Sequence, residues 1–473
     1  MTHAPMAAVW EELGGDPALL PGVSTVTRAG ALEAALPVRE SARACVGACA
    51  LAAAELGARR AGLPRVPRVS VDDGAVATAF VSERHLRIDG RAPVNFAPLS
   101  RFWRTADGWV RTHANYPHHR ARLLDALGAP DDASADDVAA LLAGRSAREI
   151  EESVYDAGGL AVALRTPEEW AAHGQGLALA RRPLIERGGT AGPDGKAAAR
   201  QRVLAPPAGG GPLLPAAGVR VLDLTRVIAG PVATRTLALL GADVLRVDAP
   251  RLPEDPDAHA DTGFGKRSTL LDLAADRRAF DELLASADVV VTGYRPGALD
   301  RFGLSPEALA ERDPGLVVAQ VSAWGAYGPW GGRRGFDSLV QVATGIAVTE
   351  GSPERPGALP AQALDHGTGY LLAAAVLRAL TERAERGHGC VVRLALARTA
   401  MWLTDGIGRR EGPGAPADLS VAEPYDRPDA WLSERAAPVG LLGHALPPVS
   451  FAGGPTDWSR PPGRWGTDPA RWT

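Results

Sequence analysis

Asp365 stands at the start of a predicted helix, and Gly367 and Gly369 follow it within one turn. Backbone N–H groups at a helix N-terminus stabilise a carboxylate as an anion, and they can also stabilise an oxyanion that develops during a reaction. The two glycines would leave room for a bulky ligand to approach. Asp365 is therefore a candidate nucleophile, and the N-cap of its helix is the structural alternative; the two roles are compatible.

Histidines and cysteines form two small clusters elsewhere in the chain. His113, His118 and His119 lie close together in HANYPHHR, but a zinc site needs a further ligand at defined spacing, and none follows locally. We interpret these histidines as loop or helix-start residues near a cleft. Cys45 and Cys49 are four residues apart on a predicted helix, where small buried hydrophobic residues are the simpler interpretation. The sequence predicts no metal site.

Strands and helices alternate through the middle of the chain. A buried strand over residues 219–224 precedes a turn, an apolar helix over 232–240 and a second strand over 244–247. This order predicts parallel strands joined by right-handed crossovers, and so a doubly wound α/β sheet. Further short strands rich in β-branched residues are expected at 289–292, 316–322 and 391–395.

Stretches rich in Gly and Pro divide the chain into parts. The large α/β domain is expected at 216–410, and a smaller α+β domain with a hairpin and several helices at 100–185. Residues 186–215 are expected to be a linker. Residues 411–473 are expected to form an extended C-terminal arm whose tryptophans dock on a neighbouring surface.

Composition narrows the class of protein. The formal net charge is -4, with acidic and basic residues mixed, which favours neither a nucleic acid nor an anionic membrane as partner. The longest apolar run, near 45–54, is too short to span a bilayer, and the first residues do not resemble a secretory signal. Three cysteines do not form a disulfide framework. We expect a cytoplasmic protein.

Residues 40–80 resemble residues 365–404 without a gap, at the shift of 325 positions that separates Glu40 from Asp365. Each copy is expected to be a helix, a strand and a second helix. An internal duplication would make residues 1–99 a partial, degenerate copy of the end of the large domain. Glu is one methylene longer than Asp and lacks the flanking glycines, so we expect the first copy to be structural.

A series of motifs in the large domain resembles the class III CoA-transferase family, also called CaiB/BaiF. The first is VLDLTRVIAGPVATRTLALLGADVLRVDAP at 221–250. The others follow in the family's order: the Gly-Lys-Arg-Ser at 265–268, ADVVVTGYRPGALDRFGL at 287–304, SAWGAYGPW at 322–330, GFDSLVQVATG at 335–345 and ALDHGTGYLLAAAVLRALTER at 363–383.

The resemblance implies an enzyme that moves CoA from an acyl-CoA to a carboxylic acid, with Asp365 as the residue that takes the acyl group. It implies acyl-CoA and a small carboxylic acid as substrates and no tightly bound cofactor. It also implies that CoA contacts come from Arg246, Lys266, Arg267, Arg295 and the close-approach glycine Gly230. After Val247 the sequence departs from the family, because an acidic insert at 254–261 follows the strand.

Two other functions fit the same resemblance. The family includes 2-methylacyl-CoA racemases, but Phe336 stands where these carry a His before Asp337. A catalytically silent CoA-binding or scaffold protein is the second alternative, since the N-terminal part resembles the later portion of a family member and the order of the parts is unusual. Family members form interlocked dimers, so we expect either a homodimer or an intramolecular pseudo-dimer.

Overall fold

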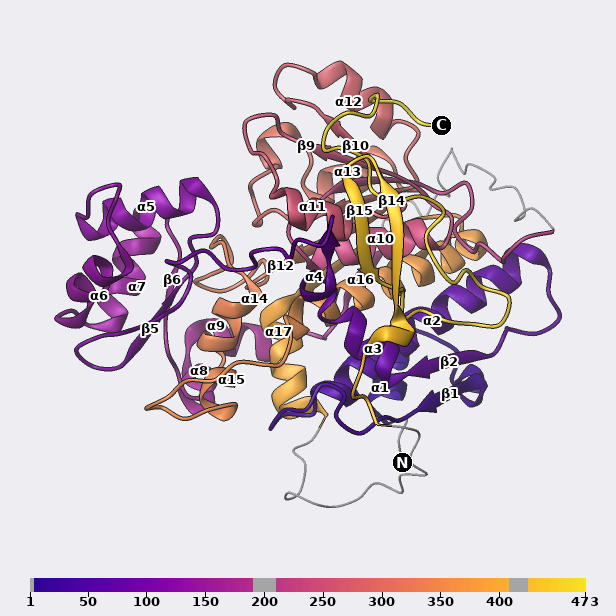
Figure 1. Cartoon of the computed structure of the whole chain (residues 1–473). Helices are drawn as coiled ribbons and strands as arrows, with labels where there is room; N and C mark the ends of the chain where they lie inside the picture. The colour runs from indigo at the N-terminus through magenta and orange to yellow at the C-terminus, as the bar shows by residue number, and fades with distance from the viewer. Residues whose placement is uncertain (1–3, 190–209, 408–423) are drawn as a thin grey trace.

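A seven-stranded sheet forms the centre of the large domain (Figure 1). The computed structural model describes residues 4–189, 210–407 and 424–473. The strand order is β10-β9-β8-β11-β12-β13-β7; six strands are parallel and β7 pairs antiparallel with β13 at one edge. The strands are β7 Glu186–Gly189, β8 Arg220–Leu224, β9 Asp243–Asp248, β10 Arg267–Leu270, β11 Val289–Thr292, β12 Val317–Ser322 and β13 Cys390–Ala395.

The chain runs outward from β8 in both directions, so the strand order reverses between β8 and β11. This confirms the doubly wound α/β sheet, in which ligands bind at the carboxyl ends of the strands beside the reversal. Apolar helices cover both faces of the sheet and supply most of its core. The helices of this region are α10 Ala229–Leu239, α11 Pro256–Thr262, α12 Arg277–Leu284, α13 Pro306–Arg312, α14 Asp337–Ala343, α15 Ile346–Thr349, α16 Ala363–Arg386 and α17 Leu396–Met401, with short turns of helix at Asp300–Phe302 and Trp402–Gly406.

The smaller domain lies to one side of the sheet and has its own core (Figure 1). Its hairpin β4–β5 carries β6 as a third antiparallel strand, and helices pack against this sheet. A capping box between Thr166 and Glu169 begins α8, with both of its hydrogen bonds formed. The elements are β4 Phe102–Arg104, β5 Trp109–Thr112, α5 Pro117–Leu127, α6 Ala135–Ala143, α7 Ala147–Asp156, β6 Ala161–Ala163, α8 Pro167–Ala172 and α9 Gly174–Ala180.

The N-terminal segment packs its long helix α2, Val38–Ala61, against α16. Both helices have 24 residues, their bounds differ by the expected shift, and both end at a glycine with positive φ, Gly62 and Gly387. Among the described residues α2 alone is long and apolar enough to cross a membrane, but its apolar stretch is wholly buried inside the protein. The other elements are α1 Ala4–Glu12, a turn of helix at Pro17–Gly22, β1 Val23–Val26, β2 Val69–Asp72, α3 Asp73–Ala79, α4 Ser82–His85 and β3 Arg87–Ile88.

Two expected boundaries differ in the structure. Residues 186–189 of the expected linker form β7, because antiparallel pairing with β13 supplies the hydrogen bonds that their sequence does not announce; 190–209 lie outside the described residues. The expected arm begins with residues outside the described part, up to 423, and then forms the hairpin β14 Leu432–Ala437 and β15 Gly440–Ala445, after a helical turn at Asp429–Trp431. This hairpin pairs with β3.

The rest of the arm lies along the large domain. The indole N–H groups of Trp458, Trp465 and Trp472 donate hydrogen bonds to Arg235 O, Asp248 Oδ2 and Leu283 O, at 2.8, 2.9 and 3.1 Å. Tryptophan combines a large apolar surface with one donor, so each ring is both packed and hydrogen-bonded. The arm thereby supports the outer strands of the sheet, close to the end of β9.

Candidate functional site

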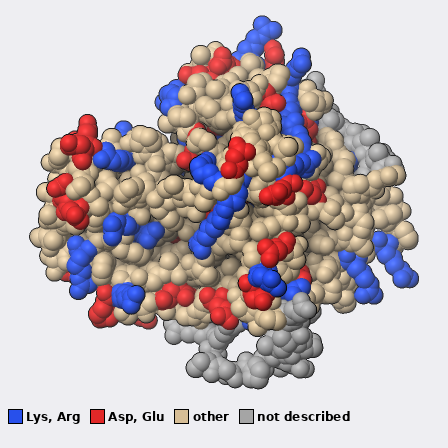
Figure 2. Space-filling view, in the orientation of Figure 1, with Lys and Arg blue, Asp and Glu red and all other residues tan. Residues whose placement is uncertain are grey.

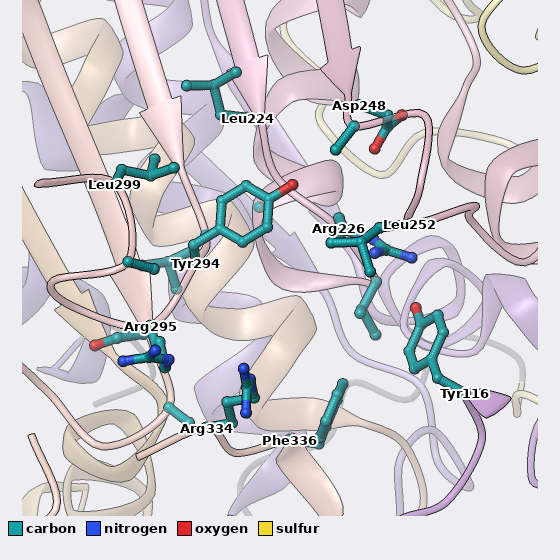
Figure 3. Close-up of a pocket in the computed structure, with 18 of the residues that line it drawn as sticks. Tyr116, Leu224, Arg226, Asp248, Leu252, Tyr294, Arg295, Leu299, Arg334 and Phe336 are labelled. Atoms are coloured by element: carbon teal, nitrogen blue, oxygen red, sulfur yellow. The ribbon is translucent and has the colours of Figure 1, made fainter. Parts of the chain in front are cut away.

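A cavity of about 700 Å³ opens at the carboxyl ends of β8, β9, β11 and β12, where the strand order reverses (Figure 3). The small domain closes it from the other side with Tyr116 and the start of α5. Apolar walls come from residues such as Val227, Ile228, Leu252 and Phe336. The polar and charged residues that line it are Tyr116, His118, His119, Arg122, Arg226, Asp248, Arg251, Asp272, Tyr294, Arg295, Arg301, Ser322, Arg333, Arg334 and Asp365.

Asp365 lines this cavity from the first turn of α16 and is 6% exposed. The N-cap residue of α16 is Gln362, so the alternative that Asp365 caps its own helix is wrong. Within the described residues, the Asp365 carboxylate has no hydrogen-bond or ion-pair partner. A buried carboxylate without donors is costly to ionise and is free to meet a ligand.

The N–H groups at the start of α16 are occupied by another carboxylate. Asp337 Oδ2 accepts hydrogen bonds from the backbone N–H groups of Leu364 and Asp365, both at 2.9 Å. The side chain of Gln341 donates to Asp337 Oδ1. The helix terminus therefore stabilises Asp337 as an anion, whereas the sequence had pointed to Asp365 as the group it would stabilise.

The carboxyl groups of Asp365 and Asp337 differ in how readily they ionise. Burial, and then the negative charges of Asp337 and Glu83, raise the pKa of Asp365 well above that of an ordinary aspartate. Burial also raises the pKa of Asp337 to about 6, although three hydrogen-bond donors oppose the effect. Since only Asp337 is stabilised by donors, it is the first of the pair to ionise as pH rises.

The glycines after Asp365 serve helix packing instead of ligand approach. A Cβ on Gly369 would lie 2.6 Å from the carbonyl oxygen of Ala229 at the start of α10, and one on Gly367 would lie 3.5 Å from the sulfur of Cys45 on α2. Neither glycine lines the cavity. Their expected role at the ligand was wrong, because the space beside Gly369 is filled by the start of α10 and that beside Gly367 by α2.

Three of the predicted CoA contacts are engaged by carboxylates and do not line the cavity. Arg246 is 1% exposed and pairs with Asp248 and with Glu254, both at 2.7 Å. Lys266 donates to Asp223 Oδ2 and to Pro231 O, both at 3.0 Å, and Arg267 pairs with Asp243 at 2.7 Å. The structure thus assigns these cations to internal ion pairs, in contrast to the contacts that the sequence led us to expect.

Glu254, from the acidic insert after β9, is one of the carboxylates that engage these cations. It also accepts a hydrogen bond from the Tyr116 hydroxyl at 2.7 Å and pairs with Arg226 at 3.3 Å. Burial alone would raise the pKa of Glu254, but Arg246, Arg226 and Tyr116 lower it to about 2. The insert therefore neutralises two basic residues beside the cavity and joins the small domain to the large one.

Arg295, just after β11, and Gly230, in the first turn of α10, line the cavity. A Cβ on Gly230 would lie 2.4 Å from Thr225 Cβ, so only glycine fits where the turn folds back on β8. Sequence reasoning missed the other arginines, among them Arg122, Arg301 and Arg334. Arg334 lies immediately before the GFDSLVQVATG motif at 335–345, and Figure 3 shows its side chain on the same side of the cavity as that of Arg295.

The histidine cluster lies at the small-domain side of the cavity, where we expected it. His118 and His119 line the cavity, and the His113 ring stacks on Phe336 with centroids 3.7 Å apart. Burial lowers the pKa of His113 to about 3, so this ring is neutral. No group of three or more His, Cys, Asp and Glu residues that could hold a metal ion occurs in the described part of the chain.

Val227, in the turn beside Glu254, has a φ of +72°. This left-handed conformation costs a β-branched residue roughly 1–2 kcal/mol. We expect Val227→Gly to raise the free energy of unfolding by up to about 1 kcal/mol, because the lost strain exceeds the greater backbone entropy of glycine. Denaturant unfolding measures it. Ile228→Gly is the matched control: Ile228 has a φ of -122°, so the same change there should destabilise.

The site of this α/β fold thus combines a cavity at the reversal point of an open sheet with several arginines and a buried carboxylate. Residues 216–409 match the model of CoA-transferase family III. The similarity to this family therefore extends over less than half of the chain.

Two relatives and one solved structure are similar to this chain over part of its length. The chain is 36% identical over 212 residues to acetyl-coenzyme A transferase nodX of Hypoxylon pulicicidum, covering 43% of this chain and 36% of that protein. It is 36% identical over 208 residues to the probable fatty acyl-CoA transferase Rv3272 of Mycobacterium tuberculosis, covering 41% and 53%. A crystal structure of Rv3272 aligns at 32% identity over 44% of this chain and 62% of that one, with a TM-score of 0.40.

The matched region is only part of these relatives. The chain spans 36% of the length of the first and 53% of the second. The remainder of this chain, with its small domain ahead of the large one, lies outside the matched residues.

Proposed function

We propose that this protein is a CoA-transferase that moves CoA between an acyl-CoA and a carboxylic acid, with Asp365 as its covalent nucleophile. The observation that carries the proposal is the Asp365 carboxyl group, which faces the cavity without a partner among the described residues and lies inside the family III region. The names of the relatives, an acetyl-coenzyme A transferase and a probable fatty acyl-CoA transferase, support the same reaction class.

The reaction passes through alternating anhydride and thioester intermediates, so that an acyl group stays activated until a new acyl-CoA forms. Asp365 Oδ attacks the thioester carbon, the carbon–sulfur bond breaks, and CoA leaves as a thiolate from a mixed anhydride. The thiolate attacks the aspartyl carbonyl, which forms an aspartyl-CoA thioester and releases the first acid. The carboxylate of the second acid attacks this thioester, its carbon–sulfur bond breaks, and CoA thiolate leaves from a new anhydride. CoA thiolate then attacks the acyl carbonyl of that anhydride and regenerates Asp365.

The cavity offers cations for the phosphates of CoA. Arg226, Arg251 and Arg333 pair with Glu254, Asp272 and Glu152. In the described part of the chain, Arg122, Arg295, Arg301 and Arg334 have no carboxylate partner. Burial, and then the charges of Arg295 and Arg122, lower the pKa of Arg334. A bound anion would relieve their repulsion.

We expect Arg334→Gln and Arg295→Gln each to raise KM for the acyl-CoA about tenfold with little change in kcat, because a charge-assisted hydrogen bond to phosphate is lost. Steady-state kinetics with several acyl-CoA substrates measures this. Arg333→Gln is the matched control, since the guanidinium of Arg333 is already paired with Glu152. This variant should change KM less. Equal effects from all three would contradict the assignment of the phosphate to the unpaired cations.

The racemase alternative has less support. Phe336 occupies the position at which the racemases carry a His, and its ring stacks on that of His113. His366 lies beside Asp365 in sequence, but its Nε2 is 3.3 Å from Glu83 Oε2, its ring stacks on Phe80, and it does not line the cavity. Exchange of deuterium at the 2-position of a 2-methylacyl-CoA, without CoA transfer, would favour the racemase.

The experiment that tests the proposal is covalent trapping. The protein is incubated with a panel of acyl-CoA substrates, quenched with hydroxylamine, and digested for mass spectrometry. We expect a hydroxamate at Asp365 that forms only when acyl-CoA is present. Absence of an adduct across the panel, together with absence of CoA transfer, would leave the CoA-binding scaffold as the function.

We further infer that α2 and α16 derive from an internal duplication and that the chain forms an intramolecular pseudo-dimer. The matched bounds and ends of the two helices support this. Glu40, the counterpart of Asp365, does not line the cavity. Beside it, Arg39 pairs with Glu40 and Arg43 pairs with Asp73 at 2.6 Å, which fits a structural first copy. A monomer in sedimentation equilibrium would agree with a pseudo-dimer, and a stable homodimer would contradict it.

A further inference from the structure

Asp337 holds the segment that carries Asp365. It is the first residue of α14, is fully buried and lies behind the cavity wall. Asp337 accepts two hydrogen bonds from the backbone of Leu364 and Asp365 and one from the side chain of Gln341. The side-chain Oε1 of Gln341 in turn accepts the backbone N–H of Leu359 at 2.9 Å. The backbone from 359 to 365 is thus fixed at both ends by α14.

Capping of a helix from a distant element is a specific arrangement. A helix is usually capped by its own N-cap side chain. In α16 that residue, Gln362, makes no side-chain capping bond to the described residues, and Asp337, 28 positions before Asp365, supplies it. The distance from Asp365 to the cavity is therefore set by α14 and does not depend on the helix alone. Displacement of a reacting group by about 1 Å can cost roughly a hundredfold in rate.

Asp337 also shapes the charge that Asp365 meets. The titratable groups that face Asp365 are Asp337 from α14, Glu83 from α4 and the adjacent His366. Arg111 from β5 is the cation that acts on Asp337. Because the helix terminus and Gln341 stabilise Asp337 as an anion, Asp365 meets a second buried negative charge. A carboxylate that is poorly stabilised holds its electron pair loosely, and so attacks an acyl carbon more readily once ionised.

We propose that Asp337 is a positioning residue for the reaction, which anchors the backbone of Asp365 and, as a second buried negative charge, keeps the Asp365 carboxylate reactive. The inference rests on the proposed function, since it concerns the nucleophile of that reaction. It assigns a role to α14 that is independent of which acyl group or acid is bound. The two halves of the role, place and charge, can be separated by substitution.

Asp337→Asn removes the charge but retains an oxygen that can accept the two backbone N–H groups. Asp337→Glu retains the charge but displaces it by a methylene. In a plot of kcat against pH, the acid limb is the rise in kcat as Asp365 ionises. We expect this limb to move to lower pH in Asp337→Asn, with kcat reduced about tenfold. We expect Asp337→Glu to lose roughly a hundredfold in kcat, with the acid limb close to that of the unaltered protein. A merely structural role would change the folded fraction in both variants without moving the limb.

Glu83→Gln provides the second measurement for the charge, since Glu83 makes no hydrogen bond to the backbone of α16 in the described part of the chain; its hydrogen bond there is with the side chain of His366. It should move the limb in the same direction as Asp337→Asn and by less, and it decides the question of charge if Asp337→Asn does not fold. An acid limb unmoved in both would overturn the inference, as would an unchanged kcat in Asp337→Glu. Trapping at Asp365 in the unaltered protein is measured in parallel. An adduct there with an unmoved limb rejects the role of Asp337 alone, whereas no adduct rejects the proposed function.

Discussion

Asp365→Asn should abolish CoA transfer, with a loss of roughly a thousandfold or more, because an amide cannot form the anhydride through which the acyl group passes. The side chain keeps its volume, so the cavity and the start of α16 should be retained. Transfer is followed by chromatography of the acyl-CoA product. A variant that kept more than about a tenth of the activity would contradict a covalent role for this residue.

The same variant should be more stable than the unaltered protein at neutral pH. Burial and the charges of Asp337 and Glu83 raise the pKa of Asp365 in the folded state, so the folded protein binds this proton more tightly than the unfolded chain. The group therefore favours folding at low pH, and that stability is lost as pH rises above the unfolded pKa of about 4. The difference in Tm between variant and unaltered protein should be near zero at pH 4 and positive at pH 7.

Lys266→Met should destabilise the protein by about 3–5 kcal/mol, because it leaves the Asp223 carboxylate buried without its cation. Lys266 is 3% exposed, and burial lowers its pKa to about 8 although Asp223 opposes the shift, so the amine is mostly charged at pH 7. Its second bond, to Pro231 O, fixes the turn that carries Val227 and Gly230. Denaturant unfolding measures the loss.

The double variant Asp223→Asn/Lys266→Met is the control for this prediction. Asp223 also accepts hydrogen bonds from Thr225 and Thr234, and an amide can keep part of this network. We expect the double variant to recover part of the lost stability. If Lys266→Met instead stayed stable and only raised KM for acyl-CoA, the amine would be a phosphate contact, as the resemblance first implied.

The parallel sheet was predictable because its strands are short apolar runs between turn residues. The strand at 289–292 was placed at its observed bounds, and the others within one or two residues, because β-branched runs mark buried strands. β10 and β7 were missed. Three of the four residues of β10 are polar, and β7 contains two glycines, so neither has a local apolar pattern and they depend on pairing with β9 and β13 respectively.

The site was predictable only in part, for a related physical reason. Asp365, Arg295 and Gly230 follow from motif and strand-end position. The sequence does not say which basic residues remain available to a ligand, because their carboxylate partners come from other strands or from the insert, as Asp243 does for Arg267 and Glu254 for Arg246. Arg334 and Arg122 become lining residues only when the small domain meets the sheet. The mixture of charges over one face of the molecule gives no hint of the cavity (Figure 2).

The pairing of α2 with α16 has a consequence for synthesis of the chain. α2 is apolar and buried along most of its length, and its partner begins 325 residues later. At ribosomal rates of about 5–20 residues per second, α2 waits roughly 15–65 s for the helix that covers it. The nascent N-terminal third therefore exposes an aggregation-prone apolar surface during translation. The yield of folded protein should rise when a holding chaperone is supplied or when α16 is synthesised faster.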